Sequence, residues 1–218
     1  MRVAIYGGTY DPIHYGHLRV AEEVRETLGL DRVVFVPAYA NPFKEGEAGS
    51  PAEVRCELVR AAIEGNPGFE VSDMEISRPE TSYTINTVRA FHDLNPGVLD
   101  LSLVMGTDSF NDIRMWCDYE DLLAEASIIV VPRPGFAPKK PAEALPVELA
   151  RKFWYDAESG GYKNSFGTSL TYLSTTIMDI SSTDIRERVA AGRSIRYLVP
   201  PEVERIIAGR GLYGHKAT

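Results

Sequence analysis

The stretch Val3-Ala4-Ile5-Tyr6-Gly7-Gly8-Thr9-Tyr10-Asp11-Pro12-Ile13-His14-Tyr15-Gly16-His17-Leu18 decides how the fold of this chain begins. Its first four residues are apolar without polar alternation, which is typical of a parallel strand buried on both faces. The glycine pair that follows lets backbone amides approach a ligand closely, and the segment leads into a helix whose N-terminus attracts phosphate. The stretch therefore predicts a strand, an anion-binding loop and a helix, in that order.

The same arrangement recurs along the chain. Further apolar runs that predict buried strands lie at 33–36, 101–105 and 128–131. Helical patterns lie between them, with apolar residues on one face at Leu18, Ala21, Val24 and Leu28, and again at Val54, Leu58, Ala61 and Ala62. Ser50, Pro51 and Glu53 predict a capping box at the start of the second helix. This alternation predicts an α/β fold with an open, Rossmann-like, doubly wound parallel sheet, whose ligands bind beyond the carboxyl ends of the strands.

The second half of the chain is less regular. A stretch rich in proline and glycine at 133–141 precedes an irregular region that reaches Thr176 and is interpreted as a lid or a connection. Two helices, near 183–191 and 201–208, follow it. We expect one domain over residues 1–218, with a small C-terminal helical part from about residue 182.

Composition excludes several classes of protein. A formal net charge of −8 over 218 residues argues against a general nucleic-acid binder. Cys56 and Cys117 lie far apart, so no disulfide framework or structural zinc site is indicated. The N-terminus lacks the features of a signal peptide, and no membrane span is indicated, so we expect cytoplasmic localisation. Assembly into a homo-oligomer stays open.

His14 and His17 are the first candidate functional residues. Both stand near the start of the predicted helix, where imidazoles can donate hydrogen bonds to phosphate oxygens and stabilise charge on a departing pyrophosphate. The alternative is a tight turn with two incidental histidines. A two-histidine metal site is disfavoured, because no further ligand stands at a familiar spacing.

A second candidate anion site lies at 180–186, Ile-Ser-Ser-Thr-Asp-Ile-Arg. Ser181, Ser182 and Thr183 can cap the helix that follows, and capping is compatible with phosphate binding by free amides. Arg186 stands one turn further on. Two anion-binding helix starts that bracket the edge of the sheet fit a triphosphate.

Further candidates follow predicted strands. Gly106 ends a buried strand and permits close approach of the backbone, while Asp108 is suited either to ribose hydroxyls or to capping of the next helix. Lys44 and Arg133 are either surface cations or phosphate contacts at the ligand-binding edge. Thr84 stands near the start of a helix predicted over about 83–94, where it or Ser82 could serve as the cap.

The segment 7–18 resembles the His-x-Gly-His signature of the nucleotidyltransferase superfamily, and its full form is similar to that of bacterial nicotinate-nucleotide adenylyltransferases. Other segments occur in the order found in that family, namely Asn41-Pro42-Phe43-Lys44, Ser82-Tyr83-Thr84, Gly106-Thr107-Asp108, Trp116, Arg133 and 180–186. Phe43 departs from the family, which more often has a second proline there. The resemblance spans nearly the whole chain.

The resemblance implies transfer of AMP from ATP to nicotinate mononucleotide, giving nicotinate adenine dinucleotide and pyrophosphate in NAD biosynthesis. Mg²⁺ would accompany ATP, and no protein ligand is assigned to it. The implied ATP site comprises Gly7, Gly8, Thr9, Tyr10, His14, His17, Gly106, Asp108, Arg133, Ile180, Ser181, Ser182 and Arg186. The implied acceptor site comprises Gly8, Thr9, Lys44, Ser82, Tyr83, Thr84 and Trp116, whose indole would stack on the pyridine ring unless it is a core residue.

The implied reaction is an in-line attack of an acceptor phosphate oxygen on the α-phosphorus of ATP. The nucleophile is already an anion, so no general base is required, and His14, His17, Lys44 and Arg186 would spread the developing charge. Alternative acceptors are nicotinamide mononucleotide and phosphopantetheine. A catalytically inactive nucleotide-binding regulator is the alternative from another class, and the histidine pair argues against it.

Overall fold

The computed structural model describes residues 1–40, 42, 49–96 and 100–214. Lys44, predicted as a phosphate and acceptor contact, lies outside the described residues, as do its neighbours Asn41 and Phe43.

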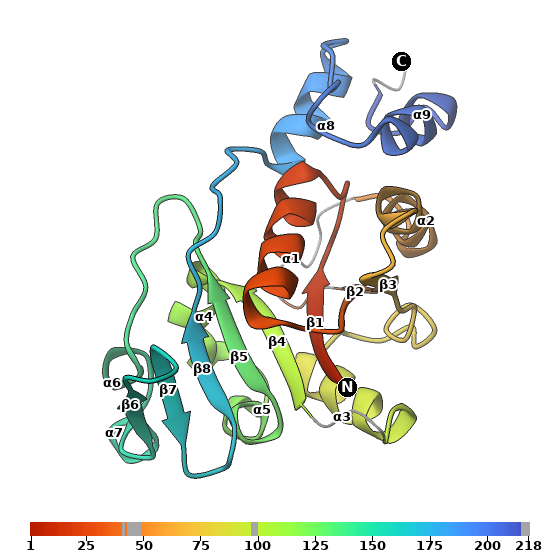
Figure 1. The fold of residues 1–218 in the computed structure, drawn as a ribbon. Helices are drawn as coiled ribbons and strands as arrows, with labels where there is room; N and C mark the ends of the chain where they lie inside the picture. Colours follow the sequence, from red (N-terminus) through yellow and green to blue (C-terminus); the bar gives the residue numbers. More distant parts are fainter. Residues whose placement is uncertain (41, 43–48, 97–99, 215–218) are drawn as a thin grey trace.

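One mixed sheet forms the centre of the molecule (Figure 1). Its order is β3-β2-β1-β4-β5-β8-β7-β6. The four predicted strands are present as β1 (Arg2–Gly8), β2 (Arg32–Pro37), β4 (Asp100–Gly106) and β5 (Ser127–Val131). The short β3 (Phe69–Val71) pairs with β2, and all of these strands run parallel.

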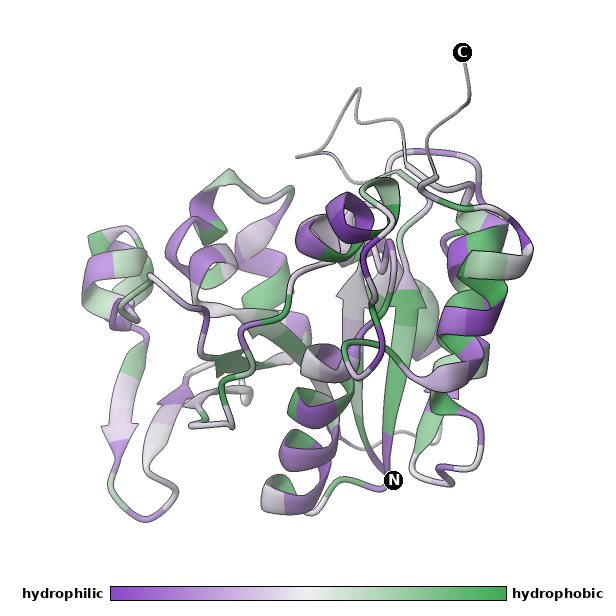
Figure 2. Cartoon of the chain, turned by 90° about the horizontal axis from the view of Figure 1, so that it is seen from above, coloured by the Kyte–Doolittle hydropathy of each residue, from purple (hydrophilic) through white to green (hydrophobic). Residues whose placement is uncertain are grey.

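Helices cover both faces of the sheet, as a doubly wound fold requires. Val3 and Ile5 of β1 pack with α3 (Thr84–Leu94), α4 (Thr107–Asn111) and α5 (Tyr119–Glu125) in one core cluster, which also includes η1 (Ile113–Met115). Ala4 belongs to a second cluster, on the opposite face, with α1 (Tyr15–Leu28), α2 (Ala52–Ile63), α8 (Ser182–Ala190) and α9 (Pro201–Gly209). Seen from above, the central strands are mostly apolar and the helices around them carry both polar and apolar residues (Figure 2). The predicted fold class is confirmed.

The predicted capping box of α2 is wrong. The N-cap residue is Pro51, and no side chain caps the helix. The backbone of Ser50 has other partners, because its amide donates to Asp11 Oδ2 at 3.2 Å and its carbonyl accepts from Arg55 Nε at 3.1 Å. Ser50 therefore lies one residue before the N-cap, and its backbone is held by Asp11 and Arg55.

The region before Thr176 is more regular than predicted. It contains α6 (Pro141–Ala144), α7 (Val147–Ala150) and the strands β6 (Phe153–Asp156), β7 (Gly161–Asn164) and β8 (Ser169–Tyr172). β8 pairs parallel with β5, and β6 and β7 extend the sheet as an antiparallel hairpin. Four-residue strands carry too little periodicity to be recognised in the sequence. Among the described residues, no helix is long and apolar enough to cross a membrane.

Candidate active site

A cavity of about 530 Å³ opens at the carboxyl ends of β1, β4 and β5, where the strand order predicts a ligand site. Gly7 and Gly8 from β1, Gly106 from β4 and Val131 from β5 reach its wall. The starts of α1, α3 and α4 and the segment before α8 complete the wall. The strand ends therefore gather the predicted segments around one space.

His14 and His17 form a packed pair in this wall. Their ring centroids are 3.7 Å apart, and the backbone amide of His14, the N-cap residue of α1, donates to His17 Nδ1 at 3.3 Å. A Cβ atom on Gly16 would lie 3.0 Å from the His14 ring, so the absence of a side chain there accommodates the ring. With Nδ1 of His17 accepting, its Nε2 carries the proton of the neutral imidazole and can donate to a ligand.

Burial keeps both imidazoles neutral at pH 7. Desolvation, helped by the nearby charge of Arg133, lowers the pKa of His14 to about 4. The pKa of His17 lies well below its usual value because of its burial, with further contributions from His14 and Arg133. The pair therefore offers neutral hydrogen-bond donors that are already shielded from bulk water before a phosphate binds.

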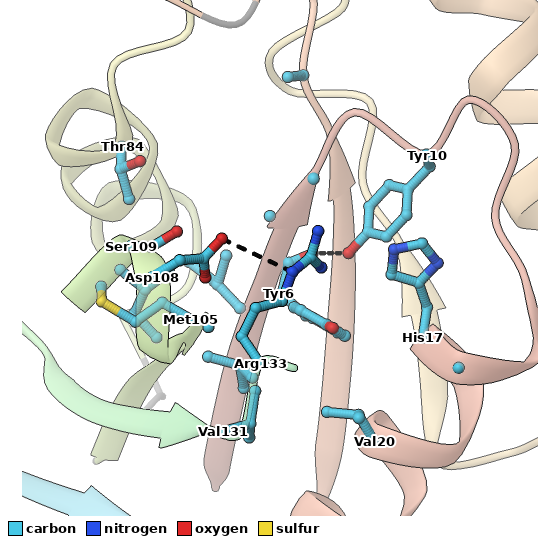
Figure 3. A pocket seen from close by; sticks show the side chains of 18 of the residues that line it. Tyr6, Tyr10, His17, Val20, Thr84, Met105, Asp108, Ser109, Val131 and Arg133 are labelled. Atoms are coloured by element: carbon cyan, nitrogen blue, oxygen red, sulfur yellow. Dashed lines mark hydrogen bonds and ion pairs between the residues drawn. The ribbon is translucent and has the colours of Figure 1, made fainter. Parts of the chain in front are cut away.

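Tyr10 supports the histidine pair from behind. Its ring lies against Gly8, where a Cβ atom would come within 2.8 Å of it, and edge-on to His17 at a centroid distance of 5.1 Å. Its hydroxyl donates to the Tyr6 carbonyl at 2.6 Å, and only 2% of the residue is exposed (Figure 3). A left-handed φ of 52° turns the chain at this non-glycine residue. The main contribution of Tyr10 to the cavity wall is therefore its packing against Gly8 and His17. The space beside Gly7, by contrast, is open.

Asp108 and Arg133 face each other across the cavity floor. Arg133 Nε lies 3.7 Å from Asp108 Oδ2, and the guanidinium reaches toward the Tyr10 and His17 rings (Figure 3). Gly106, not Asp108, is the N-cap residue of α4, so the predicted capping by Asp108 is wrong. A Cβ atom on Gly106 would collide with the Asp108 carboxylate in its present position, so the glycine lets this carboxylate lie close to the backbone. Both side chains are available to a ligand.

The start of α3 forms the opposite side of the cavity, across from His17 (Figure 3). Tyr83 is its N-cap residue and no side chain caps it, so the predicted capping by Ser82 or Thr84 is wrong. The Ser82 hydroxyl instead accepts from the Tyr39 amide at 3.0 Å. First-turn amides of a helix have no intrahelical acceptor, so this uncapped start can bind an anion.

Trp116 was predicted either to be a core residue or to stack on the pyridine ring, and the stacking stays a prediction. It packs against the core cluster that contains α3 and α4, and it also lines the cavity.

The start of α8 is organised differently. Ser181 is its N-cap residue, and its hydroxyl accepts from the Asp184 amide at 3.1 Å, so the predicted capping is confirmed. The Ser182 hydroxyl donates to the Pro12 carbonyl at 2.8 Å, and Arg186 Nη1 donates to the Asp11 carbonyl at 2.9 Å. These contacts dock α8 on the segment that leads to the histidines.

The structure brings most of the predicted residues together. Ile180 and Ser181 line the cavity, whereas Thr9, Ser182 and Arg186 are not among the described residues that do so. Thr9 turns its carbonyl toward Arg55 Nη1, at 2.6 Å. The hydrogen bonds of Thr9, Ser182 and Arg186 are thus made to neighbouring segments outside the cavity lining.

Sequence reasoning missed the wall formed by residues 175–179, which leads from β8 toward α8. Thr176 fastens this wall to α1, because its amide and its hydroxyl each donate to the Glu23 carboxylate at 2.6 Å. An extended segment has no periodic pattern of apolar residues. The one signal in the sequence that could have indicated this wall is its position directly before the helix predicted near residue 183. Cavity residues outside the predicted motifs also include Val20, Glu75, Met105, Ser109, Met115 and Cys117.

Among the described residues, no group of three or more His, Cys, Asp or Glu side chains is arranged to hold a metal ion.

Comparison with known proteins identifies the family. A model of the cytidylyltransferase-like family matches residues 5–188. A probable nicotinate-nucleotide adenylyltransferase of Pelobacter propionicus is 42% identical, with 98% of each chain covered. One from Geobacter sulfurreducens is 44% identical, with 99% of each chain covered.

A solved structure, Plasmodium falciparum nicotinic acid mononucleotide adenylyltransferase complexed with NaAD, superposes with a TM-score of 0.72. The two chains are 18% identical and 97% of each is covered, which shows the shared fold. This chain therefore belongs to the cytidylyltransferase-like family and, within it, to the nicotinate-nucleotide adenylyltransferases.

Proposed function

We propose that the protein transfers AMP from ATP to nicotinate mononucleotide, releasing pyrophosphate and forming nicotinate adenine dinucleotide. One observation carries the proposal: a single cavity has a neutral histidine pair on one side and the uncapped start of α3 on the other. Two anionic substrates can therefore meet there, each facing hydrogen-bond donors. The relatives that are 42 to 44% identical over the whole chain support the same activity.

ATP takes the histidine side in this proposal. Its phosphates lie over Gly7 and Gly8, within reach of the imidazole donors and the Arg133 guanidinium. Asp108 accepts from ribose hydroxyls, and Ile180 and Ser181 contact the nucleoside together with the wall at 175–179. The Arg186 side chain, already bonded to Asp11, holds the histidine segment in place.

Nicotinate mononucleotide takes the other side. The carboxylate of its ring accepts hydrogen bonds from first-turn amides of α3, beginning with Thr84, while Trp116 covers one face of the ring. Ser82 and Tyr83 form the wall beside it. Lys44, outside the described residues, is proposed to meet the phosphate groups between the two substrates.

The chemistry needs alignment more than proton transfer. A phosphate oxygen of the mononucleotide attacks the α-phosphorus of ATP, and the bond from that phosphorus to the bridging oxygen of pyrophosphate breaks. Holding the two anions in line can supply roughly 7 to 11 kcal/mol of the barrier. His14 and His17 donate to the oxygens that gain negative charge. We propose that Mg²⁺ enters with ATP, held by phosphate oxygens and water.

Pyrophosphate release, followed with ATP, Mg²⁺ and one acceptor at a time, tests the proposal. The acceptors are nicotinate mononucleotide, nicotinamide mononucleotide and phosphopantetheine, and kcat/KM is recorded for each. We expect a clear preference for the nicotinate substrate. Equal turnover of the amide would contradict the carboxylate site at α3, and no turnover with any acceptor would favour a regulator that only binds nucleotides.

A further inference from the structure

Arg55 of α2 is a buried cation that binds backbone carbonyls of three separate segments. Only 5% of the residue is exposed. Its Nη1 donates to the Thr9 carbonyl at 2.6 Å, its Nη2 to the Tyr39 carbonyl at 3.1 Å and its Nε to the Ser50 carbonyl at 3.1 Å. None of the ion pairs among the described residues includes it. The rigid fork of a guanidinium suits several carbonyls at once, whereas a lysine ammonium is a single point charge.

Two of these carbonyls belong to segments that lead to the two sides of the cavity. Thr9 follows the Gly7 and Gly8 loop and precedes the histidine segment. Tyr39 follows β2, and its amide donates to the Ser82 hydroxyl at 3.0 Å. The amide of Ser82 donates in turn to the Ala40 carbonyl at 2.9 Å, so the chain after β2 is bonded directly to the segment that starts α3.

Glu75, which lines the cavity, continues this network on the acceptor side. Its Oε1 accepts from the Thr87 hydroxyl at 2.5 Å, and the Ser82 side chain is also hydrogen-bonded to its carboxylate. Burial raises the pKa of Glu75, and the positive charge of Arg55 acts on it in the opposite direction. Arg55, Tyr39, Ser82 and Glu75 thus form a network that connects the two sides of the cavity, and two of its members, Ser82 and Glu75, line the cavity.

We propose that Arg55 is a positioning residue that sets the spacing between the segment carrying His14 and His17 and the acceptor segment Ser82–Thr84. The proposal rests on the proposed function, because spacing matters where two substrates must react in line. A displacement of about 1 Å between reacting groups can cost about 100-fold in rate.

The test compares Arg55→Lys and Arg55→Met with Arg60→Met, a control in the same helix whose exposed side chain pairs with Asp73 at 3.2 Å. We expect kcat to fall about 100-fold in both Arg55 variants, while ATP and nicotinate mononucleotide, each alone, bind within about threefold of the parent protein. The control should match the parent protein in all three measurements.

Hydrogen exchange of the ligand-free protein supplies a readout that a general loss of stability would not give. Amides of residues 7–10 and 82–85 should exchange faster in Arg55→Lys, while those of β4 and β5 keep their protection. Hydrogen exchange needs no acceptor substrate, so it tests the spacing role of Arg55 independently of catalysis. If the parent protein does not use nicotinate mononucleotide, the proposed function is overturned, but the exchange data still decide the role of Arg55.

Three results would overturn the proposal: a normal kcat in Arg55→Lys, faster exchange on one side only, or equal loss of protection throughout the sheet. Where the Arg55 variants do not fold, Ser82→Ala cuts the same network beyond Tyr39 and leaves Arg55 in place. This variant should lower kcat about five- to tenfold and speed hydrogen exchange at residues 82–85. If kcat and exchange are both unchanged, the proposal that this network sets the spacing is rejected.

Discussion

The two sides of the cavity use different parts of the chain to meet a ligand. On the histidine side, side chains do so, and they are buried, packed ring against ring and supported by Tyr10. On the acceptor side, α3 begins without a side-chain cap, and Tyr83 at its start is 40% exposed. One side presents fixed imidazoles, and the other presents backbone amides with an aromatic neighbour.

In the proposed function, this difference separates catalysis from recognition. Buried neutral donors need little reorganisation when charge develops, so the histidine side suits stabilisation of the transition state. Amides at a helix start bind a carboxylate better than a carboxamide, because their positive end attracts negative charge. Substitutions on the first side should therefore change kcat, and those on the second should change the choice of acceptor.

The largest effect is expected for His17→Ala. Removal of one donor to the developing charge should lower kcat about 100- to 1,000-fold and change ATP binding far less. His92→Ala is the matched control, because His92 lies on α3 and contacts the Glu125 carbonyl at 3.0 Å, away from the cavity. Steady-state kinetics with calorimetric ATP titration measures both quantities, and an unchanged kcat would remove His17 from the catalytic assignment.

A smaller effect is expected at the acceptor side for Thr84→Pro. Proline is tolerated at the first position of a helix, and the extended backbone of Tyr83 suits the residue before it. The variant lacks the Thr84 amide, so the kcat/KM ratio of acid to amide acceptor should fall about 10- to 100-fold. Thr84→Val keeps the amide and should keep most of the ratio. An equal loss in Thr84→Val would move recognition to the hydroxyl.

The buried histidine should also make stability depend on pH. His14 has a folded pKa of about 4, below its value of about 6.5 in the unfolded chain, so the unfolded state takes up the proton first as pH falls. The free energy of unfolding should therefore drop by about 2 kcal/mol from this group between pH 6.5 and 5. In urea unfolding at both pH values, the free energy of unfolding of His14→Gln should fall by about 2 kcal/mol less than that of the parent protein. Identical dependence in parent and variant would mean that His14 is not buried neutral.

The smallest effect is expected at the capped start of α8. Ser181→Ala removes the acceptor of the Asp184 amide and should lower the free energy of unfolding by about 1 kcal/mol. Ser181→Asp keeps an acceptor at the cap and should recover most of the loss in thermal unfolding. If neither variant changes stability, the cap makes no contribution, and α8 starts as α3 does.

Much of the fold follows from the sequence. Apolar runs such as 3–6 predict buried strands because burial on both faces leaves no place for polar alternation. The hairpin of β6 and β7 was missed because its strands have four residues each. Ser50 was wrongly interpreted as a cap, because the sequence does not show that the helix begins one residue later, after Pro51, with the Ser50 backbone bonded to Asp11 and Arg55.

The site divides in the same way. The histidine side was predicted because its chemistry lies in side chains at a recognisable spacing. On the acceptor side, Ser82 and Thr84 were placed correctly at the cavity, but the uncapped helix start is a backbone feature. Arg55 carries no local signal of burial, because its three partners are carbonyls distant from it along the chain or outside its helix.

Transfer of the AMP group is tested most directly by following labelled phosphorus from ATP. The protein is incubated with nicotinate mononucleotide, Mg²⁺ and ATP labelled at either the α- or the γ-phosphate, and the products are separated. The account predicts that the α label appears in nicotinate adenine dinucleotide and the γ label in pyrophosphate. Appearance of the γ label in the acceptor product, or of the α label in free AMP alone, would contradict it.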